Sequence, residues 1–171
     1  AGIHVQIPVK FFYDQVRRTG HEPDTKKLIA VGQVFLPRTD FGAQERCRTI
    51  VETEVLRMGH YIYGWRHVPV DTSVLGEKAN ATRPEIEQIL IRCEKDIDQE
   101  QFERELYIIR RRIEKAALAA QIQGLAPIAA CTEAPYSRRV VFAGPPSRLP
   151  FLQPNNGPLA VLSVCRTQGF E

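Results

Sequence analysis

The chain contains the stretch Tyr63-Gly64-Trp65-Arg66-His67-Val68-Pro69-Val70-Asp71-Thr72-Ser73-Val74-Leu75-Gly76, which includes its only tryptophan. The aromatic and apolar residues before Pro69 predict a buried strand that leaves the core at the proline. The aspartate that follows predicts a single capped turn, closed by Gly76. Trp65 and Leu75 are expected to pack in the core. The stretch pairs no nucleophile with a base and has no metal-ligand spacing. It therefore indicates local structure but no catalytic or metal site.

Bulk properties indicate one ordinary domain. The chain has 171 residues, of which 43% are hydrophobic and 25% charged, as in globular proteins. A net charge of +3 is too small to argue for nucleic acid unless it gathers on one face. No apolar run reaches the ~20 residues of a membrane helix. We therefore expect neither a nucleic-acid nor a membrane partner.

The cysteines and the first residues carry two further expectations. Four cysteines without a C-x-x-C pair favour free thiols in a reducing, cytoplasmic compartment over a disulfide framework. The start, Ala1-Gly2-Ile3-His4-Val5, has no initiator methionine, no basic region and no small-residue cleavage site. We expect these residues to lie within a strand. We also expect the chain to be a piece of a longer protein.

Strands alternate with amphipathic helices along the chain, which is typical of a layered α/β or α+β domain. Local patterns do not say which strands pair. Strands are predicted over residues 3–7, 28–36, 61–68 and 86–91, with weaker patterns at 128–131, 139–142 and 159–165. Helices are predicted from Pro8 to Gly20, from Asp40 to Gly59, and over residues 98–121, with a polar loop at 77–83.

The helix predicted over residues 98–121 has the clearest pattern, because its apolar residues recur every three or four positions. Asp98 and Gln101 resemble a capping box. The residues expected on the buried face are Phe102, Leu106, Ile109, Ile113, Ala116 and Ala120.

Residue types that could carry chemistry are present but not grouped. The four histidines have no zinc-like spacing, and His60 and His67, seven residues apart on one strand, are expected on opposite faces. Cys47 lies on an apolar helix face and is expected in the core. Cys93 ends a strand and could in principle be a nucleophile, but no base is recognisable near it. Consecutive arginines at 110–112 should not converge, and Glu103, Glu105 and Glu114 can neutralise them.

Several blocks resemble the N-terminal glutamine amidotransferase domain of the glutamate synthase large subunit. The family pattern Gly-Trp-Arg-x-Val-Pro-Val-Asp-x-x-Val-Leu-Gly matches residues 64–76. Similar blocks stand in the same order at residues 2–12, 31–37, 84–90, 102–110 and, more weakly, 137–144. This divides the chain into a partial amidotransferase domain at 1–144 and a divergent Pro-rich tail at 145–171. A shifted reading frame would also produce such a tail.

The resemblance implies an N-terminal-nucleophile hydrolase, an α+β fold with αββα layers. In this family the first cysteine attacks the carboxamide of glutamine, with its own α-amino group as base and an oxyanion hole of backbone and Asn groups. The ammonia travels to a synthase site, where 2-oxoglutarate is aminated and reduced with FMN and an iron–sulfur cluster. The implied partners are glutamine, the rest of the synthase chain, and a small reductase subunit.

The family's reacting residues are not found in this sequence. The nucleophilic cysteine should precede Ala1, and the Arg-Phe-Ser-Thr-Asn and His-Asn-Gly-Glu-Ile-Asn segments should follow residue 144. Asn155-Asn156-Gly157 lies between prolines and is interpreted as a turn. We therefore assign no catalytic, cofactor-binding or metal residue, and expect the chain alone to release no ammonia from glutamine. The alternative is a stand-alone, non-catalytic α/β module that binds a small ligand or a partner.

Overall fold

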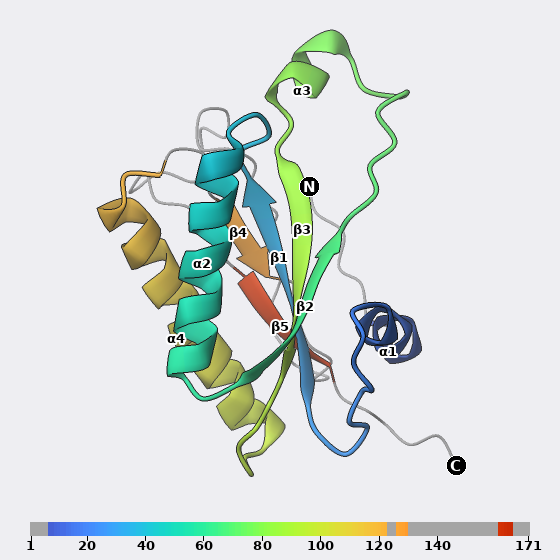
Figure 1. Cartoon of the computed structure of the whole chain (residues 1–171), viewed down its shortest axis with the longest axis vertical. Helices are drawn as coiled ribbons and strands as arrows, with labels where there is room; N and C mark the ends of the chain where they lie inside the picture. The colour runs from blue at the N-terminus through green and yellow to red at the C-terminus, as the bar shows by residue number, and fades with distance from the viewer. Residues whose placement is uncertain (1–6, 123–125, 130–160, 166–171) are drawn as a thin grey trace.

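The computed structural model describes residues 7–122, 126–129 and 161–165 (Figure 1). The expected strand at 139–142 lies outside these residues, as do most of the strand expected at 3–7 and the end of that at 128–131. The elements are α1 (Val9–Arg18), β1 (Ile29–Leu36), α2 (Phe41–Arg57), β2 (Tyr61–His67), α3 (Glu77–Thr82), β3 (Glu85–Arg92), α4 (Gln99–Ala119), β4 (Ala126–Ala129) and β5 (Val161–Cys165).

The strands form one antiparallel sheet in the order β2-β3-β1-β4, with β5 also paired to β1. Helices α2 and α4 lie side by side on one face, and α1 lies on the other (Figure 1). We call these the helix-layer face and the α1 face. Strand β1 is buried on both faces, as its continuous apolar run predicted. The described residues thus form part of an α+β domain, with one of the two sheets that αββα layering requires.

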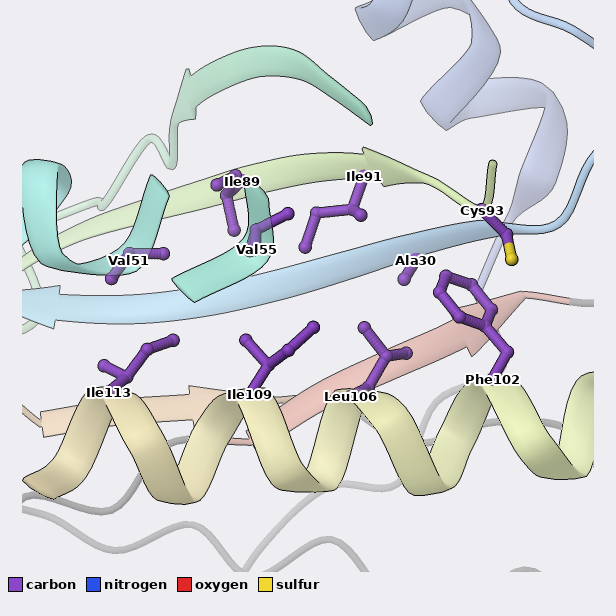
Figure 2. Packing of buried hydrophobic residues seen from close by; sticks show 10 residues of the cluster. All are labelled: Ala30, Val51, Val55, Ile89, Ile91, Cys93, Phe102, Leu106, Ile109 and Ile113. Carbon is purple, nitrogen blue, oxygen red and sulfur yellow. The ribbon is translucent and has the colours of Figure 1, made fainter. Parts of the chain in front are cut away.

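The main core lies between the helix-layer face and the two long helices, because alternate strand residues point there. Figure 2 shows Phe102, Leu106, Ile109 and Ile113 along α4, directed at the sheet. Opposite them lie Ala30, Val51, Val55, Ile89, Ile91 and Cys93. The predicted stripe is confirmed for most of its length. Its end is wrong, because the helix buries Ala117 and leaves Ala120 exposed.

The α1 face carries a smaller core. Phe12 and Val16 of α1 pack on Val31, Tyr63 and Leu90 of the sheet. Thr19 ends the helix as its C-cap, and Gly20 follows at φ +86°, in the left-handed region that favours glycine. The short amphipathic helix predicted after Pro8 is therefore confirmed, and it covers part of the second face.

Both long helices begin with the caps that the sequence indicated. Asp40 accepts a hydrogen bond from the Ala43 amide at 2.8 Å. Asp98 accepts one from the Gln101 amide at the same distance. Each cap satisfies one of the four free N–H groups at a helix start.

Strand β2 departs from the prediction of a buried strand. Among the described strands it lies at the edge of the sheet, with Tyr61 exposed and Trp65 half-buried. Its pairing with β3 is interrupted by a bulge, since Ile62 lies opposite Ile91 but Gly64 lies opposite Leu90. A bulge inserts one residue and reverses the alternation of faces beyond it.

The loop predicted at residues 77–83 is also corrected, because residues 77–82 form helix α3. Gly76 does not close a turn but is the N-cap of this helix, and its carbonyl accepts from the Asn80 amide at 2.9 Å. Glu77 in the first turn favours the helix start. Arg83 ends the helix because it precedes Pro84. Helix α3 has no buried residue and lies beyond the end of the sheet (Figure 1).

Candidate functional site

The stretch at residues 63–76 joins the edge strand to the helix layer. The Trp65 indole Nε1 donates to Oε1 of Glu52 on α2 at 2.6 Å. Beyond the strand, Asp71 accepts from the Ser73 amide at 2.9 Å, and the predicted turn closes from the Leu75 amide to the Thr72 carbonyl at 3.1 Å. These contacts shape the backbone and hold two elements together. Trp65 packs against the main core, as expected, whereas Leu75 is only half-buried.

A buried histidine lies between the start of β2 and α4. Nε2 of His60 is 2.9 Å from Oε2 of Glu105, and Lys95 Nζ donates to the same oxygen at 2.7 Å. The ring of Phe102 lies edge-on to the imidazole, with centroids 4.9 Å apart. Burial lowers the pKa of His60, against the attraction of Glu105. The imidazole is fully enclosed between the strand and the helix.

His60, which directly precedes β2, and His67, which ends it, lie on the same face of the sheet, so the expectation of opposite faces is wrong. The bulge adds one residue between them, so simple alternation fails. His60 contacts α4 on the helix-layer face, and His67 Nδ1 lies 2.9 Å from Oε1 of Glu85. His67 is 62% exposed. No signal in the local pattern marks this bulge except Gly64, which has φ +138°.

Both described thiols are buried and unactivated. Cys47 packs with Val34, Leu36 and Ala117, and burial raises the pKa of Cys47 to about 11. Burial also raises the pKa of Cys93. A reactive cysteine needs a lowered pKa and access to solvent. Neither thiol has the environment of a nucleophile.

Two of the three arginines at 110–112 donate to one carboxylate. Arg110 and Arg111 both donate to Glu114. Burial raises the pKa of Glu114, against the attraction of the two arginines. Arg112 donates to the sulfur of Met58 at 3.4 Å. The expected neutralisation is present, but it comes from Glu114, while Glu105 binds Lys95.

Sequence reasoning missed two polar contacts that cross between elements. Arg48 of α2 binds Glu87 of β3 with two hydrogen bonds, Nε to Oε2 at 2.8 Å and Nη2 to Oε1 at 2.6 Å. The second is a row of polar side chains on the α1 face. Gln88 of β3 lies between Gln33 of β1 and Arg66 of β2 and is directly opposite both. Both depend on the strand order, which local periodicity does not contain.

Within the described ranges, no three His, Cys, Asp or Glu side chains come together as a metal site. The described helices include none that is long and apolar enough to span a membrane.

Comparison with known proteins gives a consistent set of similarities. The model of the family "Glutamine amidotransferases class-II" matches residues 1–141. The chain is 63% identical over 123 residues to the glutamate synthase [NADPH] large chain of Azospirillum brasilense, covering 71% of this chain and 8% of that relative. It is 38% identical over 117 residues to the chloroplastic ferredoxin-dependent glutamate synthase of Spinacia oleracea, covering 68% and 7%. The chain thus spans less than a tenth of these relatives' length.

Proposed function

The chain belongs to the class II glutamine amidotransferase family, and from this premise we propose that it is part of the glutaminase domain of a glutamate synthase. The observation that carries the proposal is the 63% identity to a glutamate synthase large chain over 71% of this chain. The complete protein would release ammonia from glutamine and use it to convert 2-oxoglutarate to glutamate, giving two glutamates in all.

The described residues would supply scaffold to this reaction. Their two thiols, Cys47 and Cys93, are buried with raised pKa values, which does not suit attack on a carboxamide. The cysteine nucleophile and the glutamine-binding groups would belong to other parts of the protein. What this part provides is a rigid sheet, held to two long helices by the main core, against which those groups can be positioned.

The division of the chain and its wider partners are further parts of the proposal. Residues 1–144 would be the amidotransferase part and 145–171 a divergent tail, a division supported by the family match to residues 1–141. FMN, an iron–sulfur cluster and a small reductase subunit would be bound by the rest of a longer, cytoplasmic protein that assimilates nitrogen.

A chimera tests the proposal directly. The matching segment of the Azospirillum brasilense relative is replaced by that of this chain, and ammonia release and glutamate formation from glutamine are measured separately. We expect both activities to stay within about tenfold of the parent, a loss of at most ~1.4 kcal/mol in transition-state stabilisation.

Two controls make the result interpretable. Cys47→Ser and Cys93→Ser, introduced into the chimera, should leave ammonia release unchanged, because neither thiol is proposed to react. A folded chimera without ammonia release would refute the assignment to the glutaminase domain. A loss of activity in either cysteine variant, with the fold retained by circular dichroism, would refute the scaffold role.

A further inference from the structure

Arg66 is held in place on the α1 face by neutral groups. It lies directly opposite Gln88, whose other cross-strand neighbour is Gln33. Its Nη1 donates to Oε1 of Gln88 at 2.8 Å, and Gln88 Nε2 donates to Oε1 of Gln33 at 3.4 Å. The three side chains form one hydrogen-bonded row across three strands, so the guanidinium has a fixed position.

Helix α1 contacts the Arg66 guanidinium from the other side. Oε1 of Gln15 accepts from Arg66 Nε at 3.2 Å, and the guanidinium carbon lies 5.0 Å from the ring centroid of Phe11. Arg18 follows Gln15 by three residues, so Phe11, Gln15 and Arg18 share one face of the helix. Burial, and secondly the charge of Arg18, lower the pKa of Arg66.

The positive charge at this place has no counterpart in the described part of the chain. Neither Arg66 nor Arg18 has a carboxylate partner there, whereas Arg92, on the same face, binds Glu94. A guanidinium has five N–H donors. The two glutamines engage Nε and Nη1, and Nη2 donates to no described residue. A half-buried charge of this kind is normally paired.

We propose that Arg66 and Arg18 form a binding site for a small oxyanion, a carboxylate or a phosphate. The free edge of the Arg66 guanidinium would bind two oxygens of the anion, since its planar fork matches both groups. The exposed Arg18 would add a second charge from α1. The amide row fixes the guanidinium beforehand without neutralising it, which is the arrangement that an anion site requires.

The test uses the full chain with arginine side chains labelled with ¹⁵N. Inorganic phosphate and acetate are titrated separately at a constant ionic strength of about 0.15 M, with potassium chloride as the reference salt. We expect the Arg66 Nε–Hε signal to shift and saturate with at least one probe, at a Kd of the order of 1 mM. Saturation with phosphate alone or acetate alone supports the site and identifies its ligand class.

Matched variants separate a site from general charge attraction. Arg66→Gln should weaken binding by at least about tenfold, and Arg66→Lys by a similar factor because lysine lacks the fork. Arg18→Gln, on an exposed position, should weaken binding several-fold. Arg46→Gln removes the same charge from an exposed position on α2 and should leave the Kd within about twofold.

Three results would overturn the proposal. The first is an Arg66 Nε–Hε signal that shifts linearly with the concentration of both phosphate and acetate, without saturating. The second is a shift of the same size when potassium chloride is added instead. The third is a loss of affinity in Arg46→Gln as large as that in Arg18→Gln. If Arg66→Gln fails to fold, the comparison of Arg18→Gln with Arg46→Gln still decides the question.

Discussion

The Trp65 indole donates a hydrogen bond to Glu52 at 2.6 Å, and this bond ties the edge strand β2 to helix α2. The bond depends on the bulge between Ile62 and Gly64. Without the inserted residue, Trp65 would point to the α1 face and could not meet Glu52. The most recognisable stretch of the chain therefore acts by fixing an edge strand to its helix layer.

Removing either partner of this bond should destabilise the fold. Trp65→Phe and Glu52→Ala should each lower the free energy of unfolding by about 1–2 kcal/mol, as for a hydrogen bond to a charged group that is half-buried. The double variant should show a coupling energy of about 1 kcal/mol. Urea unfolding followed by circular dichroism measures all three. Glu100→Ala, at an exposed position on α4, should change stability by less than about 0.5 kcal/mol.

The bulge makes Gly64 intolerant of a side chain. Its φ of +138° is in a region that L-residues avoid, and a Cβ there would lie 3.1 Å from Cγ2 of Thr19. Gly64→Ala should therefore cost about 2–3 kcal/mol of stability. Thr19→Ser should recover only part of this loss, because the backbone strain remains.

Gly76 offers a matched control for that substitution. A Cβ at this position meets nothing within 4 Å, and its φ is −65°. Gly76→Ala should therefore change stability by less than about 1 kcal/mol. Equal losses in Gly64→Ala and Gly76→Ala would contradict the role given to the bulge.

Helices α1, α2 and α4 and the central strand could be predicted because their signals are local, whereas the short helix α3 was predicted as a loop. Asp40 and Asp98 mark helix starts by their own side chains, and the apolar run at residues 29–36 indicates a strand covered on both faces. The edge position of β2 could not be predicted, since strand order is a long-range property. The bulge changed the faces of His67 and Trp65 by one inserted residue, which no periodicity reveals. The Arg48–Glu87 pair and the Arg66 row were missed for the same reason.

His60 should make stability depend on pH. Burial lowers its pKa in the folded chain below the ordinary value of about 6.5. The unfolded chain therefore binds the proton more readily, and the stability from the neutral imidazole is complete above pH 6.5 and lost as the pH falls below it. Glu105 and Lys95 face the ring with opposite effects. The contribution of His60 to the free energy of unfolding should change by no more than about 1.4 kcal/mol per pH unit.

Unfolding free energies at pH 7.5, 6.5 and 5.5 measure this effect. His60→Gln should show a flatter dependence than the natural chain over this range. His67→Gln, which removes an exposed imidazole, is the matched control for the loss of a histidine. An unchanged slope in His60→Gln would show that another group is responsible.

The two described thiols should be protected by the fold. Cys47, with a pKa of about 11, and the buried Cys93 should react with iodoacetamide at pH 8 only through unfolding. Mass mapping of alkylated peptides, with and without urea, gives the rate at each cysteine. Their alkylation in the native chain should be at least about a hundredfold slower than in urea. Rapid alkylation of either cysteine in the native chain would contradict this protection and make that cysteine a candidate nucleophile.

Neighbouring isoleucines on α4 test whether the main core lies where the structure places it. Ile109 is fully buried and directed at the sheet (Figure 2), whereas Ile108 is 42% exposed. Ile109→Ala should lower the free energy of unfolding by about 3–4 kcal/mol, the sum of lost burial and a cavity. Ile108→Ala removes the same atoms and should cost less than about 1 kcal/mol, since alanine also favours the helix. Similar losses at both positions, measured by urea unfolding, would mean that α4 packs with a different face against the sheet.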